Sequence, residues 1–439
     1  MTDISRRNLI AGAGAGAVAA TGFGSFAIAQ GAASGRVVVI GGGAGGASVA
    51  RALKLEAPAL RVTLLEPNRV YSSSFFSNLY LGGFRSYRSL NHNYDGLRRL
   101  GVRVVHERAA SVNTSRKTVR TSGGDTLSYD KLIVSPGIDI KYESVPGYSA
   151  AASNGRAPHA YLTDGAGKLH LKRLLERMPD GGTVAMVMAG NPYRCPPGPY
   201  ERACMIAHFL KTNKPKSRIV ILDPKKAFSK QGVFVEAFNK YYKDIIELNL
   251  SNDIDDFSVT AFDARAREIT TKAGKKVKYD VANIIPLQSA GRIALRSGLA
   301  KGDWCPVNPE SFSSVLIKDV YVLGDAAIAA EMPKSAFSAN SQAKIAANDI
   351  LAELAKGERF PARLRNTCWS MLAPDDNVKV GASYTPKDGK LDPSGSFVSK
   401  PGEDAATRAQ NYQESIGWYS GITADMFGGP QAAGAKKAG

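Results

Sequence analysis

The stretch RVVVIGGGAGGASVARALKLEAPALRVTLLEP, residues 36–67, decides the fold. Residues 37–40 form a continuous apolar run, as a parallel strand buried on both faces requires. The glycine motif G-x-G-x-x-G follows at 41–46, and after it the sequence predicts a helix and a second strand that ends at Glu66. This order of strand, glycine turn, helix, strand and acidic residue predicts a Rossmann-like unit that binds a dinucleotide.

The glycines of this motif have separate expected roles. Gly41 makes the tight turn, Gly43 lets the backbone approach a pyrophosphate, and Gly46 lets the helix pack on the strand. The phosphates are expected at the helix N-terminus, where free N–H groups and the helix dipole favour negative charge. Glu66 is expected to hold the ribose hydroxyls. The predicted cofactor contacts of this segment are Gly41, Gly43, Ala44, Gly46, Glu66 and Pro67.

Two further segments indicate which dinucleotide to expect. Residues 314–350 contain an apolar strand, then Gly324 and Asp325, then a long helical pattern. This segment resembles the second flavin motif of flavoproteins with two dinucleotide domains, in which the aspartate binds the ribityl chain and the helix points its N-terminus at the isoalloxazine. The stretch YDKLIVSPGI, residues 129–138, resembles the strand and glycine that close the first segment of such a domain. The three motifs predict FAD, although Asp325 alone also suits a helix cap after a strand.

The order of the motifs predicts an α/β fold with two Rossmann-like, three-layer dinucleotide-binding domains. The second domain, 146–288, is inserted into the first, whose two segments are 35–145 and 289–358. A C-terminal α+β interface domain follows at 359–439, and residues 1–29 are excluded from the fold as an export signal. A mature chain of about 400 residues exceeds one hydrophobic core, which agrees with several domains.

The inserted domain departs from the pattern of nicotinamide-binding domains at its first turn. Its first predicted strand, in GGTVAMVMAGNP, leads into the proline-rich loop 191–199 and not into a second G-x-G-x-x-G. Prolines fix backbone angles, so this loop is expected to hold Cys195 rigidly. Asp223 ends the next strand, and without the glycines we interpret it as a strand end and not as a ribose ligand. The sequence therefore predicts thiol chemistry in place of nucleotide binding, and it disfavours a nicotinamide-dependent flavin reductase.

The N-terminus predicts the compartment. Arg6 and Arg7 precede a weakly apolar run that ends in an A-x-A pattern at 27–29, which is typical of a twin-arginine export signal and its cleavage site. The mature protein is therefore expected in the periplasm. The alternative, an uncleaved membrane anchor, is disfavoured because the run is rich in glycine, whereas a spanning helix needs about 20 strongly apolar residues. No other segment of the sequence predicts a membrane span.

The charge balance is strongly basic, with a formal net charge of +18. Residues 1–29 contain one acidic and two basic residues, so the mature chain carries +17. The basic residues are scattered, and aromatic residues are not interleaved with them as in a groove that binds nucleic acid. The surplus charge is expected to attract anions and acidic partner proteins, and it does not indicate a nucleic-acid site.

Five segments spread along the chain carry a closer resemblance. They are RCPPGPYERA at 194–203, WCPV at 304–307, MPKSAFSANSQAK at 332–344, NTCWSMLAP at 366–374 and GWY at 417–419. Together they resemble the flavoprotein subunit of flavocytochrome c sulfide dehydrogenase, and the resemblance covers nearly the whole mature chain. It implies sulfide as substrate and a separate c-type cytochrome subunit as partner in a heterodimer. The chain lacks C-x-x-C-H and is therefore expected to carry no covalent haem of its own.

The resemblance also implies the roles of particular residues. In that family two cysteines form a redox disulfide over the flavin, and they match Cys195 and Cys368. The family's candidate base matches Glu201, and its aromatic lid over the flavin ring matches Trp418. Several members bond the flavin through a cysteine where this chain has Ser74, in YSSSFFSN. Because a serine hydroxyl cannot form the thioether, FAD is expected to bind without a covalent bond.

Other interpretations of these residues stay open. A Cys195–Cys368 bond also suits a structural cross-link between domains, and Glu201 also suits a helix N-terminus. Cys204 lies in an apolar run and Cys305 in DWCPV, so both are expected to be structural. The five histidines show no metal spacing, so no metal site is predicted.

Two alternative functions also stay open. A sulfide:quinone oxidoreductase has a related fold but needs an amphipathic membrane-binding tail, whereas the C-terminal stretch SFVSKPGEDAATRAQNYQ is polar. The other alternative is an accessory flavoprotein of a thiosulfate-oxidising system, which the sequence alone separates poorly from a sulfide dehydrogenase.

Overall fold

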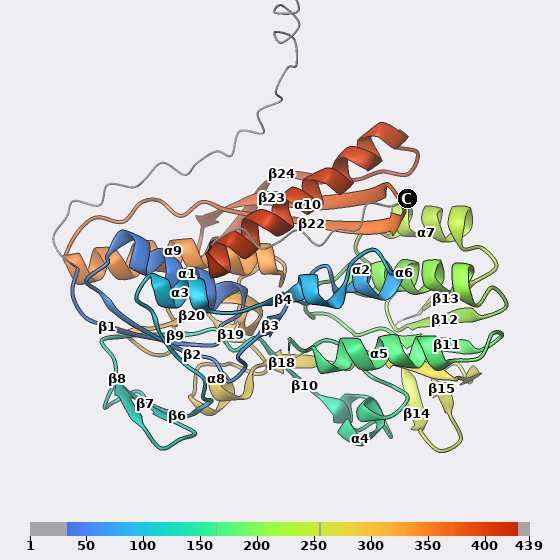
Figure 1. Cartoon of the computed structure of the whole chain (residues 1–439), viewed down its shortest axis with the longest axis horizontal. Helices are drawn as coiled ribbons and strands as arrows, with labels where there is room; N and C mark the ends of the chain where they lie inside the picture. Colours follow the sequence, from blue (N-terminus) through green and yellow to red (C-terminus); the bar gives the residue numbers. More distant parts are fainter. Residues whose placement is uncertain (1–32, 164, 254–255, 429–439) are drawn as a thin grey trace, which may run out of the picture.

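The computed structural model describes residues 33–163, 165–253 and 256–428 (Figure 1). Two parallel sheets, each with helices, lie in the two halves of the molecule, and an antiparallel C-terminal sheet lies across both. This arrangement confirms the predicted α/β fold with two Rossmann-like units. The predicted export signal, residues 1–29, lies outside the described residues.

The first parallel sheet is built from two distant parts of the sequence. Its strand order is β20-β9-β1-β2-β5, and every neighbouring pair is parallel. The helices α1 (Ala44–Glu56) and α9 (Ala336–Ala355) pack against each other on one face of this sheet (Figure 1). The strands are β1 (Arg36–Ile40), β2 (Arg61–Leu65), β5 (Arg103–Val105), β9 (Lys131–Val134) and β20 (Val320–Val322).

The second parallel sheet has the order β13-β12-β11-β17 and lies wholly within the inserted part of the chain. Its strands are β11 (Thr183–Val187), β12 (Arg218–Asp223), β13 (Ile246–Leu250) and β17 (Val281–Ile284). The helices of this half are α4 (Ala150–Asn154), α5 (Ala166–Arg177), α6 (Gly198–Asn213) and α7 (Gln231–Tyr241).

Each half also carries a three-stranded antiparallel sheet. In the first half it consists of β6 (Ala109–Asn113), β7 (Thr118–Thr121) and β8 (Thr126–Ser128). In the second half it consists of β14 (Val259–Asp263), β15 (Glu268–Thr271) and β16 (Lys276–Lys278). The chain passes between the halves through β10 (Ile138–Ile140) and β18 (Gln288–Ala290), which pair antiparallel.

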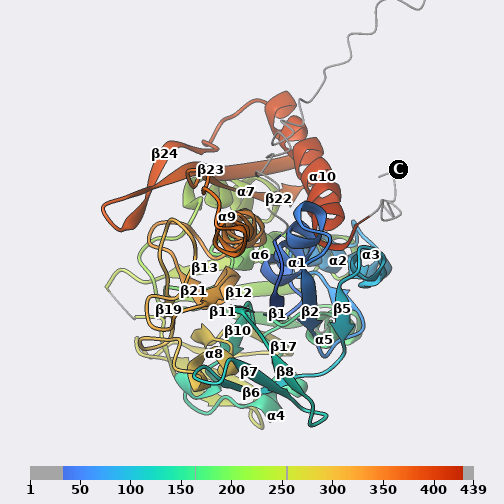
Figure 2. The ribbon, with the colours of Figure 1, turned by 90° about the vertical axis from the view of Figure 1, so that its left-hand side faces the viewer.

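The C-terminal part covers both halves. Its antiparallel strands are β22 (Leu364–Ala373), β23 (Asp376–Lys387) and β24 (Lys390–Val398), followed by α10 (Ala405–Phe427). Strand β22 packs against α9 of the first half and against α6 and α7 of the second, while α10 crosses above α1 (Figures 1 and 2). Residues of β22 can therefore reach a site between the halves.

The remaining elements are short. They are β3 (Tyr71–Ser72), β4 (Asn91–His92), β19 (Cys305–Pro306), β21 (Ala327–Ile328), α2 (Ser77–Gly82), α3 (Asp95–Arg99), α8 (Arg292–Arg296) and the 3-10 helices η1 (Tyr87–Leu90), η2 (Tyr142–Ser144) and η3 (Gly324–Ala326). Among the described helices, none is both long and apolar enough to cross a membrane.

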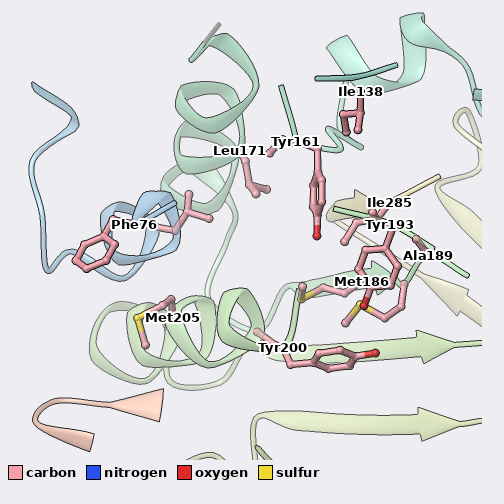
Figure 3. Close-up of a cluster of buried hydrophobic side chains, with 14 of the residues drawn as sticks. Phe76, Ile138, Tyr161, Leu171, Met186, Ala189, Tyr193, Tyr200, Met205 and Ile285 are labelled. Carbon is pink, nitrogen blue, oxygen red and sulfur yellow. The ribbon is translucent and has the colours of Figure 1, made fainter. Parts of the chain in front are cut away.

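One of the three apolar clusters among the described residues joins the halves to the C-terminal sheet. It runs from Ile40 in β1 through Met186 in β11 to Leu372 in β22. Figure 3 shows part of it, where Met186 lies above Tyr200 of α6 and Met205 lies farther along the same helix. Because buried apolar area contributes about 25 cal/mol per Å², this shared core fixes the halves relative to each other and so fixes any site between them.

Candidate functional site: a cavity between the two halves

A cavity of about 760 Å³ opens where the first parallel sheet, the inserted half and the C-terminal sheet meet. It is lined by residues from all three parts of the chain. The predicted site residues on its wall are Gly41, Gly43, Ala44, Glu66, Pro67, Cys195, Glu201, Gly324, Asp325, Cys368 and Trp418. Gly46 is the predicted contact that does not line it.

The glycine turn after β1 has the close approaches that its motif predicts. Gly41 has φ +96°, and a Cβ there would lie 2.2 Å from the carbonyl oxygen of Ser135. A Cβ on Gly46 would lie 1.8 Å from the carbonyl oxygen of Gly41, so this glycine permits helix α1 to pack on the turn. A Cβ on Gly43 would meet only the ring of Tyr71, at 3.7 Å, so this part of the turn leaves room for a ligand.

Glu66 lies at the end of β2 with its carboxylate held by the same turn. Its Oε2 accepts the backbone N–H of Gly42 at 2.9 Å, and its Oε1 accepts both the backbone and side-chain N–H groups of Asn68 at 2.9 Å. The side chain is 9% exposed and lines the cavity. A fixed carboxylate at this position suits the hydroxyl groups of a ribose.

Asp325 follows β20, the edge strand that β9 separates from β1 in the first sheet. Its Oδ1 is buried and accepts no hydrogen bond from the described residues, while its Oδ2 is 3.9 Å from Nε of Arg194. Burial raises the pKa of Asp325, and the cations of Arg194 and Lys334 oppose the rise. An unsatisfied buried acceptor on a cavity wall indicates a missing donor, which the hydroxyl groups of a ribityl chain would supply.

Helix α9 begins beside Asp325. The hydroxyl of Ser335 accepts the N–H of Ser338 and caps the helix, and the first turn lines the cavity. The backbone N–H of Gly324 donates to Oε1 of Gln342 at 2.8 Å and ties β20 to this helix. The glycine turn, Glu66, Asp325 and this helix N-terminus together fit a flavin dinucleotide that extends across the carboxyl edge of the sheet.

The structure brings Cys195 and Cys368 to the same cavity from different parts of the chain. Cys195 has φ +58°, its N–H donates to the carbonyl oxygen of Lys334 at 2.9 Å, and its carbonyl oxygen accepts the N–H of Gly198 at 2.8 Å. A Cβ on Gly198 would lie 2.8 Å from Sγ of Cys195, so the thiol needs the glycine in the motif RCPPG. Lys334 also donates through Nζ to the carbonyl oxygens of Asp325 and Ala327, which ties the thiol loop to the flavin segment.

Burial governs the acidity of both thiols. It raises the pKa of Cys195 to about 12, with further increases from Cys368 and Glu201 and decreases from Arg194 and Lys230. It also raises the pKa of Cys368, where Lys230 gives the largest opposing effect. Both cysteines are half-buried free thiols in this structure, not the disulfide that the resemblance implies, and both line the same cavity.

Glu201 does not act as a simple helix cap. It lies in the first turn of α6, but its Oε1 accepts the backbone N–H of Met371 at 2.9 Å and its Oε2 accepts Nδ2–H of Asn78 at 2.7 Å. Burial raises the pKa of this carboxyl group. The carboxyl group is thus fixed on the cavity wall and is a suitable group for taking up or returning a proton.

Trp418, Ser74 and the two remaining cysteines each have defined contacts in the structure. Trp418 of α10 stacks on Phe337 at a ring distance of 6.1 Å and lies 5.4 Å from the ring of Trp369. Ser74 lines the cavity, and its hydroxyl accepts a hydrogen bond from Nη2 of Arg194 at 3.4 Å. Cys204 and Cys305 are fully buried in the apolar core, as predicted for structural cysteines. The part of the chain that the structure describes holds no cluster suited to a metal ion.

Sequence reasoning missed several residues of this site. Arg194 was adjacent to Cys195 in the motif, so its position in the cavity could have been expected. Lys230 and Asn78 had no such signal. Tertiary packing alone brings Lys230, just before α7, to the carbonyl oxygen of Cys368, and Asn78 of α2 to Glu201. Trp369 follows Cys368 directly and shares its strand, which places it beside Trp418.

Three family models match the chain. Residues 168–286 match the central part of the sulfide dehydrogenase (flavocytochrome c) flavoprotein chain, and residues 361–427 match the flavin-binding part of flavocytochrome c sulphide dehydrogenase. Residues 35–188 match the pyridine nucleotide-disulphide oxidoreductases.

Individual proteins show the same relationship. The chain is 23% identical over 295 residues to the mitochondrial sulfide:quinone oxidoreductase of Mus musculus. This alignment covers 66% of this chain and 65% of the mouse protein, slightly less than two thirds of its length. It is 51% identical over 43 residues to the flavoprotein chain of sulfide dehydrogenase from Chlorobaculum thiosulfatiphilum, which covers 10% of this chain and 90% of that sequence. The solved structure of the sulfide:quinone oxidoreductase from Aquifex aeolicus superposes with a TM-score of 0.64 at 16% identity, over 92% of this chain and 99% of that one.

The chain belongs to the family of flavocytochrome c sulfide dehydrogenase flavoproteins, which resemble the sulfide:quinone oxidoreductases. This family implies FAD as the cofactor, and the residues of the cavity fit it.

Proposed function

We propose that this protein oxidises sulfide through a redox pair formed by Cys195 and Cys368 and passes the electrons to a separate c-type cytochrome. The observation that carries the proposal is that these two thiols line one cavity with the glycine turn, Glu66 and Asp325. A cross-link with a purely structural role has no need of a cavity of this size. The family assignment supports the same chemistry.

The sulfur chemistry uses groups of this chain. With the pair as a disulfide, hydrosulfide attacks one sulfur, a new S–S bond forms on that cysteine, and the bond between the cysteines breaks. The bonding electrons leave on the other cysteine as a thiolate, so one anion enters and one anion remains. Glu201 takes the proton from the resulting persulfide or returns it. FAD, when bound, supplies the redox chemistry that accepts two electrons from sulfur and releases them singly to a haem.

The loops around the pair hold it in place for this attack. The backbone of Cys195 is tied at both its N–H and its C=O, and Cys368 lies within a long strand whose neighbours are paired. Fixing the nucleophile and the leaving group in this way lowers the entropic cost of the exchange. Trp418, Trp369 and Phe337 line the cavity in contact with one another and give it an aromatic wall.

A quinone is the second candidate acceptor. The mouse sulfide:quinone oxidoreductase favours this acceptor, because its alignment covers 66% of this chain. The alignment with the sulfide dehydrogenase flavoprotein covers 10%. The polar character of residues 396–413 instead favours a soluble acceptor.

The test compares both acceptors. Purified FAD-loaded protein is mixed with sulfide under anaerobic conditions, and reduction of a c-type cytochrome and of a short-chain quinone is followed in parallel. We expect the cytochrome to be reduced. Reduction of the quinone with the cytochrome left oxidised would favour the quinone reductase, and reduction of neither would contradict sulfide oxidation.

The compartment and the partner form part of the same proposal. Export through residues 1–29 would place the protein in the periplasm, where the pair can rest as a disulfide. N-terminal sequencing of exported protein should begin near Gln30, and Met1 at the start would contradict export with cleavage. The net charge of +17 should speed docking of an acidic cytochrome subunit, with association slowing as salt rises.

FAD should be held without a covalent bond, because Ser74 stands where a flavin-bonding cysteine would be needed. Acid precipitation of the protein should leave the yellow colour in the supernatant. Colour that stays with the polypeptide would show a covalent link through another residue.

A further inference from the structure

A buried lysine lies beside the two thiols. Lys230 immediately precedes α7 and is 7% exposed. Its Nζ donates hydrogen bonds to the carbonyl oxygen of Cys368 at 3.1 Å and to the hydroxyl of Ser370 at 2.7 Å. Both acceptors belong to β22, so the lysine joins the inserted half to the strand that carries one of the redox cysteines.

The backbone of Lys230 has φ +62°, in the left-handed region that favours glycine. A residue with a Cβ is strained there, and such strain persists only where the surroundings impose it. At Lys230 the two hydrogen bonds of the side chain to β22 help to hold the backbone in this conformation.

The charge of Lys230 has no carboxylate partner within ion-pair distance among the described residues. The ionisable groups that face it are Cys368, Glu201 and Cys195, in decreasing order of effect. Burial lowers the pKa of Lys230 to about 8, and these three groups oppose the lowering. A buried cation is costly without an anion beside it. The ammonium group of Lys230 is therefore stabilised when one of these groups carries a negative charge.

We propose that Lys230 is the counter-ion of the anionic sulfur that Cys368 carries once the disulfide is opened, as a thiolate or as a persulfide. The inference rests on the proposed function for the event that opens the bond. Hydrosulfide brings one negative charge into the cavity and one negative charge stays on the sulfur pair. Lys230 transfers no proton in this step and acts through its charge, so it is a positioning residue.

Lys230 affects the pKa of Cys368 more strongly, relative to the other cations, than it affects the pKa of Cys195. Lys230 gives the largest lowering of the pKa of Cys368, and hydrogen bonds with Asn366 and Ser335 add to it, while Glu201 raises that pKa. Tyr384 also faces Cys368. For Cys195, the effect of Lys230 is smaller than that of Arg194, and both Cys368 and Glu201 raise the pKa.

The test measures the acidity of the Cys368 thiol directly. In FAD-loaded protein with Cys195→Ser, alkylation of Cys368 by iodoacetamide is followed against pH by peptide mass spectrometry. Adding Lys230→Met should raise the midpoint of this profile by about 1 to 3 units, because a neighbouring opposite charge is lost. Lys230→Arg should keep the midpoint close to that of the parent.

Lys172 provides the matched control. It is 8% exposed and its Nζ donates to the carbonyl oxygen of Leu81 at 2.9 Å, but it does not line the cavity. Lys172→Met should leave the midpoint unchanged, although it removes an equally buried lysine. A midpoint that is unchanged in folded Lys230→Met protein would overturn the proposal.

A second measurement serves if Lys230→Met does not fold. With Lys230 present, the midpoint for Cys368 in the Cys195→Ser protein should lie below that for Cys195 in the Cys368→Ser protein, and the reverse order would overturn the proposal. Neither measurement needs sulfide or an electron acceptor. The two proposals can therefore fail separately. If Lys230→Met shifts the midpoint but sulfide does not reduce the flavin, the role of the lysine is supported and sulfide is contradicted as the substrate.

Discussion

The two Rossmann-like halves use the same turn for different purposes. In the first half, β1 runs into three glycines, and Gly43 at the start of α1 leaves space beside the backbone. In the second half, β11 runs into a loop of prolines before α6 begins at Gly198. The loop places a thiol where the first half has room for phosphates. A parallel strand followed by a helix therefore does not determine a nucleotide site; the turn between them does.

The acidic residues after the second strand of each half show the same contrast. Glu66 lines the cavity with its carboxylate at the turn. Asp223 is fully buried, and its oxygens accept hydrogen bonds from the hydroxyl of Tyr200 at 2.5 Å and from Nζ of Lys225 at 2.7 Å. Equivalent positions in the fold thus hold one carboxylate that is available to a ligand and one that is used in packing.

The largest expected effect comes from the loop that distinguishes the second half. Cys195→Ser should reduce the rate of flavin reduction by sulfide to below about one thousandth, because serine cannot take part in sulfur exchange. Flavin bleaching is measured anaerobically with the melting temperature beside it. Normal bleaching in a less stable protein would mean that the loop holds a structural cross-link, which in the chain-entropy model is worth roughly 2–4 kcal/mol.

Cys204→Ala is the control for this variant. Cys204 lies in the core of α6 and away from the cavity, so the change should cost about 1 kcal/mol of stability and leave bleaching intact.

The glycines of the two turns give the next largest difference. Gly46→Ala places a methyl group 1.8 Å from the carbonyl oxygen of Gly41, which should cost about 3 kcal/mol and release FAD as α1 moves. Gly190→Ala in the second turn meets only Leu287, at 3.4 Å, and should change stability by less than about 1 kcal/mol. Flavin content after gel filtration and thermal unfolding measure both. Equal effects would contradict the asymmetry of the turns.

The two carboxylates allow a finer test. Glu66→Ala should weaken FAD binding by roughly 10- to 100-fold, since a hydrogen bond to a charged group contributes about 1.5–3 kcal/mol. Asp223→Ala should instead destabilise the fold by about 3 kcal/mol, because Lys225 and the Tyr200 hydroxyl lose a buried partner. Flavin titration of the apoprotein separates the outcomes. Weakened FAD binding in a stable Asp223→Ala protein would show that this carboxylate also serves the cofactor.

The residues that the sequence revealed differ in kind from those that it did not. Gly41, Gly43 and Gly46 were identifiable because each follows a local steric rule at fixed spacing. Asp325 was identifiable because a strand and a helix flank it. The positions of these residues depend on short segments alone, and the structure places all but Gly46 on the cavity wall.

The contacts that fix the thiol chemistry depend on long-range packing. Glu201 is held by Asn78 of α2 and by the backbone of Met371 in β22, and no local pattern links these positions. Lys230 resembles any surface lysine in the stretch KKAFSKQG, and only the packing of α7 on β22 buries it. Partners of this kind arise from which elements pack together, and periodicity carries no information about that.

The smallest expected effect is the response to NADH, which should not bleach the flavin. Space alone would not prevent binding, because a cavity of about 510 Å³ lies at the carboxyl edge of the second sheet. Backbone donors are fewer here: Pro197 and Pro199 have no N–H, and the N–H of Gly198 donates to the carbonyl oxygen of Cys195. With fewer backbone donors at the start of α6, the phosphates of a nicotinamide nucleotide would lose hydration with little compensation.

The measurement mixes FAD-loaded protein with NADH under anaerobic conditions and follows flavin absorbance, with sulfide as the positive control. Sulfide should bleach the flavin, and the NADH trace should match that of buffer alone. Rapid bleaching by NADH would show that the second half still binds a nucleotide despite its altered turn, and the contrast between the two halves would then lie in the thiol alone.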